Sequence, residues 1–211
     1  QISTFLDKTI ALAIAEEAVS SISYSELLIY LPVGVFGVAL STVCLPAMSS
    51  AMSSNDKSGL QSTFEKALGQ AFFLSIPCSL IYFLFSEEIL RVLYLRGNFT
   101  HESLSNTLKA FVWYIPGIPF FTATKIILPV FYAQKNTKTP FRISLICISF
   151  NLILGLSLIP WLSYGSLALA TSLASMLNFI LLWRAATKTS YLNFSPSLAK
   201  TISLQITCNL L

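Results

Sequence analysis

The chain has 211 residues, of which 55% are hydrophobic and only 10% are charged, and its mean hydropathy is +0.72. Soluble domains carry about 25% charged residues, so this composition excludes an ordinary soluble protein and predicts a polytopic membrane protein. The formal net charge is +4. Because the basic residues lie mostly in loops, they indicate membrane topology and not nucleic-acid binding.

Six apolar segments predict helices, which cover 2–15, 22–52, 61–85, 103–133, 141–159 and 166–186. An amphipathic stretch over 87–95 predicts a short helix lying in the membrane interface. A further helix begins after Pro196 and is cut off. We therefore interpret residues 1–190 as one transmembrane lobe and 191–211 as the start of a further helix. Because the chain begins at Gln1, partway into an apolar helix, we expect a fragment of a longer transporter.

Three ionisable residues, Asp7, Lys8 and Glu26, lie inside the first two predicted helices. A charge in the hydrocarbon core costs about 2.5–3.5 kcal/mol on insertion scales, so such residues commonly face a cavity. Asp7 and Lys8 form an adjacent pair that either faces a central cavity or lets Lys8 extend to the interface. Glu26 is interpreted either as a coupling or substrate-orienting carboxylate or as an interfacial carboxylate near a helix end.

A fourth charge opens the stretch KIILPVFYAQKNTKTPFR over 125–142. Lys125 lies within the apolar helix predicted over 103–133, so we expect it to face a polar pathway. The polar loop that follows carries Lys135 and Lys138, and basic residues of this kind are typical of cytoplasmic loops.

Prolines interrupt the second and fourth predicted helices. Pro32 should kink the second helix, because proline removes a backbone donor and clashes with the preceding turn. The fourth contains Pro116, Gly117 and Pro119 in close succession. Broken helices of this kind occur at transporter binding sites. If the protein alternates between two conformations, these four residues are the candidate hinges.

The basic residues are distributed unequally between the two ends of the predicted helices. One side has eight: Lys57, Lys66, Lys135, Lys138, Arg142, Arg184, Lys188 and Lys200. The other side has two, Arg91 and Arg96. The positive-inside rule places the side with eight in the cytoplasm.

Several classes of functional motif are missing from the sequence. It contains no G-x-S-x-G, Walker or H-E-x-x-H pattern. Its single histidine, His101, excludes a histidine-based metal cluster, and its four cysteines lack C-x-x-C spacing and are interpreted as small buried hydrophobes. We therefore expect a transporter and not an enzyme, with no catalytic residue, metal or cofactor, and coupled to the membrane potential or an ion gradient.

Four stretches carry a resemblance to a known family: LDKTIALAI, YSELLIYLPVGVFGVALSTVCLPAMS, GNFTHES and KIILPVFYAQKNTKTPFRISL. Over essentially its whole length the chain resembles the second half of the MurJ/MviN lipid II flippases, which belong to the multidrug/oligosaccharidyl-lipid/polysaccharide exporter (MOP) superfamily. The resemblance implies an all-α polytopic membrane protein: the second six-helix lobe of a MATE-like transporter plus the start of a further helix. It also implies a V-shaped cavity that opens alternately to the two sides of the bacterial cytoplasmic (inner) membrane.

The substrate implied by the resemblance is lipid II, the undecaprenyl-pyrophosphate-linked peptidoglycan precursor used in cell-wall synthesis. The implied partners are this lipid, the surrounding membrane lipids and a missing N-terminal lobe. Matched by position, Asp7, Lys8, Glu26 and Lys125 are the implied cavity residues. The chain departs from the family at Leu27, where the family usually has an arginine after the acidic residue, and this puts either the same substrate contact or full activity in doubt.

Two other functions compete with lipid II flipping. The first is export of drugs or other polysaccharide-linked lipids by a member of the same superfamily. The second is a non-transporting membrane subunit that serves packing or assembly, which the leucine at position 27 favours.

The charge distribution makes a direct prediction about topology. Single cysteines placed at Asn55 and Asn136 should react with a membrane-impermeant thiol reagent only from the cytoplasmic side, and one at Asn98 only from outside. Labelling can be compared in intact cells and in inverted vesicles. Reaction of the Asn136 position from outside would contradict the assigned orientation.

Overall fold

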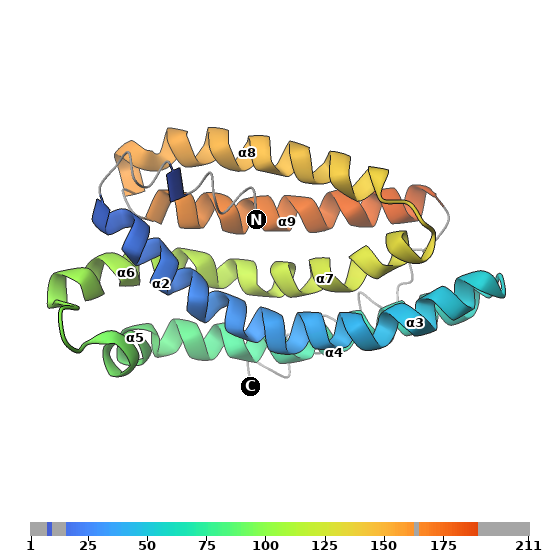
Figure 1. Ribbon diagram of the computed structural model, residues 1–211, viewed down its shortest axis with the longest axis horizontal. Coiled ribbons are helices and arrows are strands. Elements are labelled where there is room, and N and C mark those ends of the chain that lie inside the picture. The colour runs from blue at the N-terminus through green and yellow to red at the C-terminus, as the bar shows by residue number, and fades with distance from the viewer. Residues whose placement is uncertain (1–7, 10–15, 163–164, 190–211) are drawn as a thin grey trace.

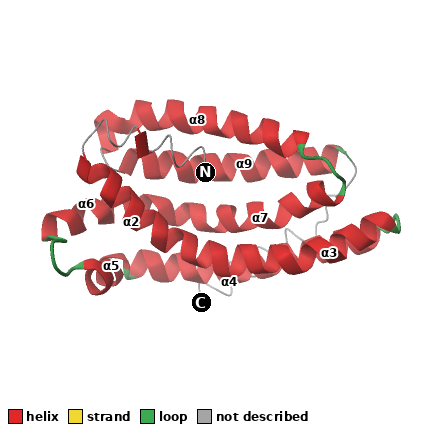
Figure 2. Cartoon of the chain, in the orientation of Figure 1, coloured by secondary structure: helices red, strands yellow, loops and turns green. Residues whose placement is uncertain are grey.

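The computed structural model describes residues 8–9, 16–162 and 165–189, and every regular element in these ranges is a helix (Figures 1 and 2). The elements are α2 (Glu16–Pro32), the π-helix η1 (Val33–Val38), α3 (Ala39–Ser53), α4 (Lys57–Leu84), α5 (Ser86–Tyr94), α6 (His101–Tyr114), the 3-10 turn η2 (Ile115–Gly117), α7 (Ile118–Ala133), α8 (Lys138–Leu162) and α9 (Gly165–Lys188). Five helices of the described chain are long and apolar enough to cross a membrane: Ala18–Ser53, Lys57–Leu84, His101–Ala133, Lys138–Leu162 and Gly165–Lys188. The prediction of an all-α polytopic membrane protein is confirmed.

Helices cover five of the six ranges expected from the sequence. Of the first range, 2–15, the structure describes only residues 8 and 9, which are helical. The further helix expected over 191–211 lies outside the described residues, so the division into a lobe and a further helix stays a prediction.

The second helix begins earlier than predicted, at Glu16 and not near residue 22. Ala18, Ser21, Ile22 and Ser25 are all buried, and their spacing places them on one face of a helix. Ser25 Oγ donates to the carbonyl of Thr107 on α6 at 3.2 Å. The sequence predicted that this helix begins near residue 22, but packing against α6 extends it back to Glu16.

Helix α7 lies at the centre of the bundle (Figure 1) and contacts α3, α4, α9 and η1. Helices α8 and α9 form an extensively packed pair along one side, and α2 packs on α6 at one end. Buried side chains form two clusters. One includes Phe64, Ile127 and Leu182, and the other includes Ile22 and Phe111.

The first helix interruption directly follows Pro32, where the chain changes from α-helix to the π-helix η1. The kink predicted at Pro32 therefore corresponds to a change in helix type. A π-helical turn inserts an extra residue into the ladder of hydrogen bonds, and such turns are frequent at functional sites.

The second interruption is the 3-10 turn η2 between α6 and α7, which contains Pro116 and Gly117. Ser172 of α9 donates its hydroxyl to the carbonyl of Trp113 at 2.7 Å, and lies 3.3 Å from that of Tyr114. A Cβ at Gly117 would lie 2.9 Å from Ser172 Oγ and 2.7 Å from Cε2 of Phe121. The absence of a side chain at Gly117 therefore lets α9 approach closely enough for Ser172 to donate a hydrogen bond to a backbone carbonyl at the helix break.

The basic loops gather at one end of the bundle (Figure 1). The loop before Lys57, the loop that carries Lys135 and the end of α9 at Lys188 lie there, while Arg91 and Arg96 lie at the opposite end. Of the eight residues counted for the basic side, Lys200 lies outside the described residues. The ends are segregated as expected, and the compartment that each faces stays a prediction.

Asp56 caps the N-terminus of α4 and makes a testable contribution to its stability. Its carboxylate accepts hydrogen bonds from the Gly59 amide at 2.9 Å and the Ser58 hydroxyl at 3.0 Å. The Gly59 backbone bond, followed by the Ser58 bond, holds the pKa of Asp56 below its usual value. The capping contribution is therefore present above the unfolded-state pKa and is lost as pH falls through the folded-state pKa.

We expect Asp56→Ala to speed hydrogen exchange of the Gly59 amide several-fold at neutral pH, because the capping acceptor is lost. Asp56→Asn should retain most of the protection and remove its pH dependence. Equal exchange in Asp56→Ala and the parent protein at neutral pH would show that the cap contributes nothing.

Candidate functional site

A cavity of about 650 Å³ opens between α2, η1, α7, α8 and α9. Most of its wall is apolar and includes Val33, Leu128, Leu145 and Ile148. Polar side chains line the rest of the cavity, and in small-molecule sites such groups fix the orientation of a bound ligand.

Lys125 lines this cavity, and its side chain is exposed. It lies eight residues before the end of α7 at Ala133, which corresponds to about 12 Å along the helix axis. Lys125 forms no ion pair with any residue that the structure describes. A cation at this depth without an internal counter-ion is suited to receive an anion from outside the chain.

Two further polar groups belong to residues that line the same cavity as Lys125. Thr124 Oγ1 and Asn178 Oδ1 are shielded from solvent, and neither finds a hydrogen-bond partner among the described residues. Both residues line the cavity. Buried polar atoms are normally hydrogen-bonded, so these two atoms are unsatisfied polar groups at the wall of the cavity.

Helix η1 holds the backbone close to Lys125. A Cβ placed on Gly37 would lie 3.3 Å from Lys125 Cγ and 3.4 Å from the Cα of Thr122. At Gly34, in the same π-helix, a Cβ would meet nothing within 4 Å. The absence of a side chain at position 37 therefore allows η1 to pack directly on the stem of Lys125.

The structure brings together two other predicted site residues. Lys8 Nζ lies 3.4 Å from Glu26 Oε2, and the Glu26 side chain is only 9% exposed whereas that of Lys8 is 41% exposed. Glu26 is therefore a buried carboxylate whose charge is compensated by Lys8. The other oxygen, Glu26 Oε1, has no hydrogen-bond partner among the described residues. Asp7 lies outside the described residues.

The Lys8–Glu26 pair is adjacent to the cavity without lining it. Tyr30 of α2 and Val33, the first residue of η1, line the cavity, and Glu26 precedes them by four and seven residues. Residues at this spacing share a helix face. Glu26 and its partner Lys8 therefore lie on the face of α2 that is turned toward the cavity. They lie closer than the cavity to the end of the bundle that is opposite the basic loops.

Leu27 points away from the core and is 67% exposed. An arginine there could extend from the surface of this chain, and leucine avoids an exposed charge in the membrane.

The four candidate hinges, Pro32, Pro116, Gly117 and Pro119, lie at η1, at η2 and in the first turn of α7. Their role in motion stays a prediction.

Sequence reasoning did not identify Tyr30, Thr124 or Asn178 as cavity residues. Each lies in an apolar helix, where a lone hydroxyl or amide resembles an ordinary core residue. The signal that could have found Asn178 is the polar stripe of Thr171, Ser175 and Asn178 at helical spacing in an apolar helix, and all three line the cavity.

Comparison with known proteins identifies the family. The family model described as lipid II flippase MurJ matches residues 1–211. The chain belongs to the MurJ family. Among its curated relatives is the probable lipid II flippase MurJ of Rickettsia prowazekii, which is 33% identical over 89% of this chain and 37% of the relative. The corresponding protein of Vibrio cholerae is 32% identical over 87% of this chain and 35% of its own length.

Solved structures support the same assignment. A lipid II flippase MurJ in an inward closed conformation matches with a TM-score of 0.78 and 26% identity, over 98% of this chain and 45% of that one. An outward-facing multidrug transporter of the MATE family matches with a TM-score of 0.75 and 12% identity, over 95% of this chain and 46% of that one, which shows the fold alone.

The resemblance to the MurJ/MviN flippases is therefore confirmed, as is the MATE-like fold. The chain is a multi-pass protein of the bacterial inner membrane. It spans little more than a third of the length of the curated MurJ proteins it matches.

The Lys8–Glu26 pair can be tested by a double-mutant cycle in the complete protein. Removal of Lys8 leaves the carboxylate of Glu26 buried without its counter-charge, which is more costly than removal of both charges. We expect Lys8→Met to lower thermal stability more than the double variant Lys8→Met/Glu26→Gln, with a coupling of roughly 1–2 kcal/mol.

Unfolding in detergent, followed by near-ultraviolet circular dichroism, gives the four stabilities that the cycle requires. Lys109→Met, an exposed lysine on α6, is the matched control and should leave stability nearly unchanged. Strict additivity of the Lys8 and Glu26 variants would show that the pair makes no contribution.

Proposed function

We propose that this chain forms the second lobe of a transporter that flips lipid II across the inner membrane by alternating access, for peptidoglycan synthesis. The observation that carries the proposal is Lys125, a cation that lines a largely apolar cavity within a membrane-spanning helix and has no ion-pair partner among the described residues. Membership of the MurJ family supports the same substrate.

The cavity chemistry suits a lipid with a pyrophosphate headgroup. A pyrophosphate brings several anionic oxygens, and the lysine ammonium can donate up to three charge-assisted hydrogen bonds to them. Thr124 and Asn178 offer further polar contacts, and the apolar wall contacts the neighbouring hydrocarbon. The Lys8–Glu26 pair supplies a second charged position on the route toward the opposite end.

Two parts of the proposed cycle depend on partners and hinges. A first lobe would form the other wall of the central cavity, and the surrounding lipids would supply and receive the substrate. Bending at Pro32 with η1, and at Pro116, Gly117 and Pro119 around η2, would open the cavity alternately. We propose that the membrane potential or an ion gradient drives this cycle, so the protein acts as a transporter and not as an enzyme.

Export of a drug or another polysaccharide-linked lipid is the second candidate. The fold likeness to an outward-facing multidrug resistance transporter of the MATE family is the observation that favours it. Lys125, which has no ion-pair partner among the described residues, argues against a cationic substrate, since it would repel one.

The decisive test replaces Lys125 in the complete protein. Lys125→Ala should reduce lipid II flipping at least tenfold while expression and membrane insertion remain normal, because the headgroup loses its cation. Lys125→Arg should retain part of the activity. Lys138→Ala, an exposed lysine at the start of α8, is the control and should flip lipid II normally.

Flipping is measured by the exposure of lipid II to an external probe in reconstituted vesicles, and by growth of cells depleted of their own flippase. Normal activity of Lys125→Ala would exclude a substrate-binding role. Export of a cationic dye without lipid II flipping by the parent protein would favour the multidrug alternative.

A further inference from the structure

Helix η1 joins α2 to α3 within one membrane-spanning segment, Ala18–Ser53, and packs on α7. Of its six residues, only Val33 and Gly37 are buried. Glycine is a weaker helix former than alanine, because it loses more conformational freedom on folding. The two glycines of η1 therefore weaken this helix, and they differ in their surroundings: Gly34 is exposed, whereas Gly37 lies against α7.

Gly37 meets the base of the Lys125 side chain. A Cβ on Gly37 would lie 3.3 Å from Lys125 Cγ and 3.4 Å from Lys125 Cβ. These are the first two atoms of the lysine side chain, so their rotamer sets the direction of the remainder. Phe121 and Leu128 lie one turn before and after Lys125 on α7, and both line the cavity. With η1 on one side and these apolar residues along its own helix, the lysine stem is directed into the cavity.

The π-helical form of η1 decides which residue meets Lys125. A π-helical turn holds one residue more than an α-helical turn, and each residue of an α-helix rotates the chain by about 100°. With α2 held in place, an α-helical form of this segment would bring Phe36, and not Gly37, against α7. A phenylalanine ring does not fit where a single methyl group would already lie 3.3 Å from the lysine stem.

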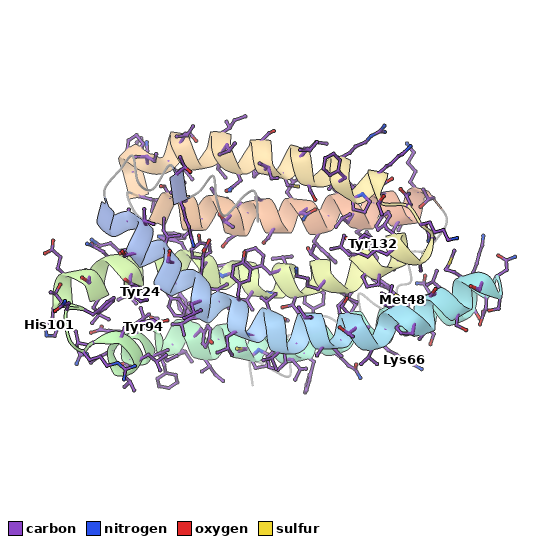
Figure 3. The ribbon with its side chains drawn as sticks, viewed as in Figure 1. Tyr24, Met48, Lys66, Tyr94, His101 and Tyr132 are labelled. Atoms are coloured by element: carbon purple, nitrogen blue, oxygen red, sulfur yellow. The ribbon has the colours of Figure 1, made fainter. Side chains whose placement is uncertain are left out.

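The same register extends into α3. Met48 lies eleven residues after Gly37, which is about three turns of an α-helix, so the two residues share one face. Met48 is fully buried and belongs to the same core cluster as Ile127 of α7. In Figure 3 it lies on the side of α3 that is turned toward α7. The packing of α3 on α7 therefore holds η1 in the register that presents Gly37.

We propose that Gly37 is a positioning residue for Lys125: its bare backbone supports the lysine stem and so places the ammonium group in the cavity. This inference rests on the proposed function, in which Lys125 binds the anionic part of the substrate. Gly37 does not itself touch the substrate, and a side chain at this position would displace the cation. Gly34 is the matched control in the same helix, because a Cβ there would meet nothing within 4 Å.

The first test observes Lys125 directly in the complete protein in detergent. Lysine amines are converted to isotopically labelled dimethylamines for NMR, and the Lys125 resonance is identified by its absence from Lys125→Arg. We expect Gly37→Ala to shift this resonance and Gly34→Ala to leave it in place, with exposed Lys138 as the internal reference. An unchanged Lys125 resonance in Gly37→Ala, or equal shifts in the two alanine variants, would overturn the proposal.

The second test measures transport. Gly37→Ala should slow lipid II flipping several-fold, and Gly34→Ala should not. In a Lys125→Ala background, Gly37→Ala should cause no further loss, because the group through which it acts is already absent. The same loss in both backgrounds would overturn the proposal. The NMR measurement involves no lipid II, so it tests the contact even if Lys125→Ala flips normally and the proposed function fails.

Thermal unfolding separates positioning from a general folding defect. The atom closest to an added methyl group is Lys125 Cγ, which Lys125→Ala removes. Gly37→Ala should therefore lower the melting temperature of the parent protein but not that of Lys125→Ala. If Gly37→Ala fails to fold alone but folds together with Lys125→Ala, the conflict with the lysine stem is demonstrated. If both fail to fold, the methyl group conflicts with the backbone at Thr122, and the proposal is overturned.

Discussion

Hydrocarbon offers no hydrogen bonds to a polypeptide backbone, and this constraint governs how the bundle is built. Each interruption of a helix must satisfy its freed carbonyls from within the protein. At η2 the hydrogen bond comes from another helix, because the hydroxyl of Ser172 on α9 donates to the carbonyl of Trp113. At η1 it comes from the chain itself, which continues in π-helical form after Pro32. The glycines at 37 and 117 let neighbouring elements approach closely enough for this arrangement.

The same constraint explains where charges are found. Within the spanning helices, Glu26 is buried against Lys8, so its charge is compensated. Lys125 has no such partner among the described residues, but its side chain reaches a cavity where water or an anion can solvate it. These two arrangements are alternative solutions to the cost of a charge in the membrane, and only the second leaves binding capacity for a ligand.

Hydropathy and turn residues predicted the spanning helices because the energetic signal for burial in a bilayer extends over many residues. The start of α2 was missed because the charged residues Glu16 and Glu17 interrupt the apolar pattern, and the packing of this segment on α6 cannot be read from the sequence. Lys125 and Glu26 were predicted as site residues because an intramembrane charge is conspicuous in any sequence. Asn178 was not, since its environment depends on packing between helices distant in the sequence. The π-helical form of η1 likewise has no simple sequence pattern.

The hydrogen bond from Ser172 has a mechanical meaning. It fastens α9 to the point where the long helix from His101 to Ala133 is broken, and α9 is itself packed along α8. The break is thus not a free joint. A rotation of α7 relative to α6 must either break this hydrogen bond or move α9 in the same direction. Because α9 packs along α8, α8 would move with it. The Lys125 cavity has walls on both α7 and α8, so a small change of angle at a single turn would be transmitted to the cavity as a concerted displacement of two walls.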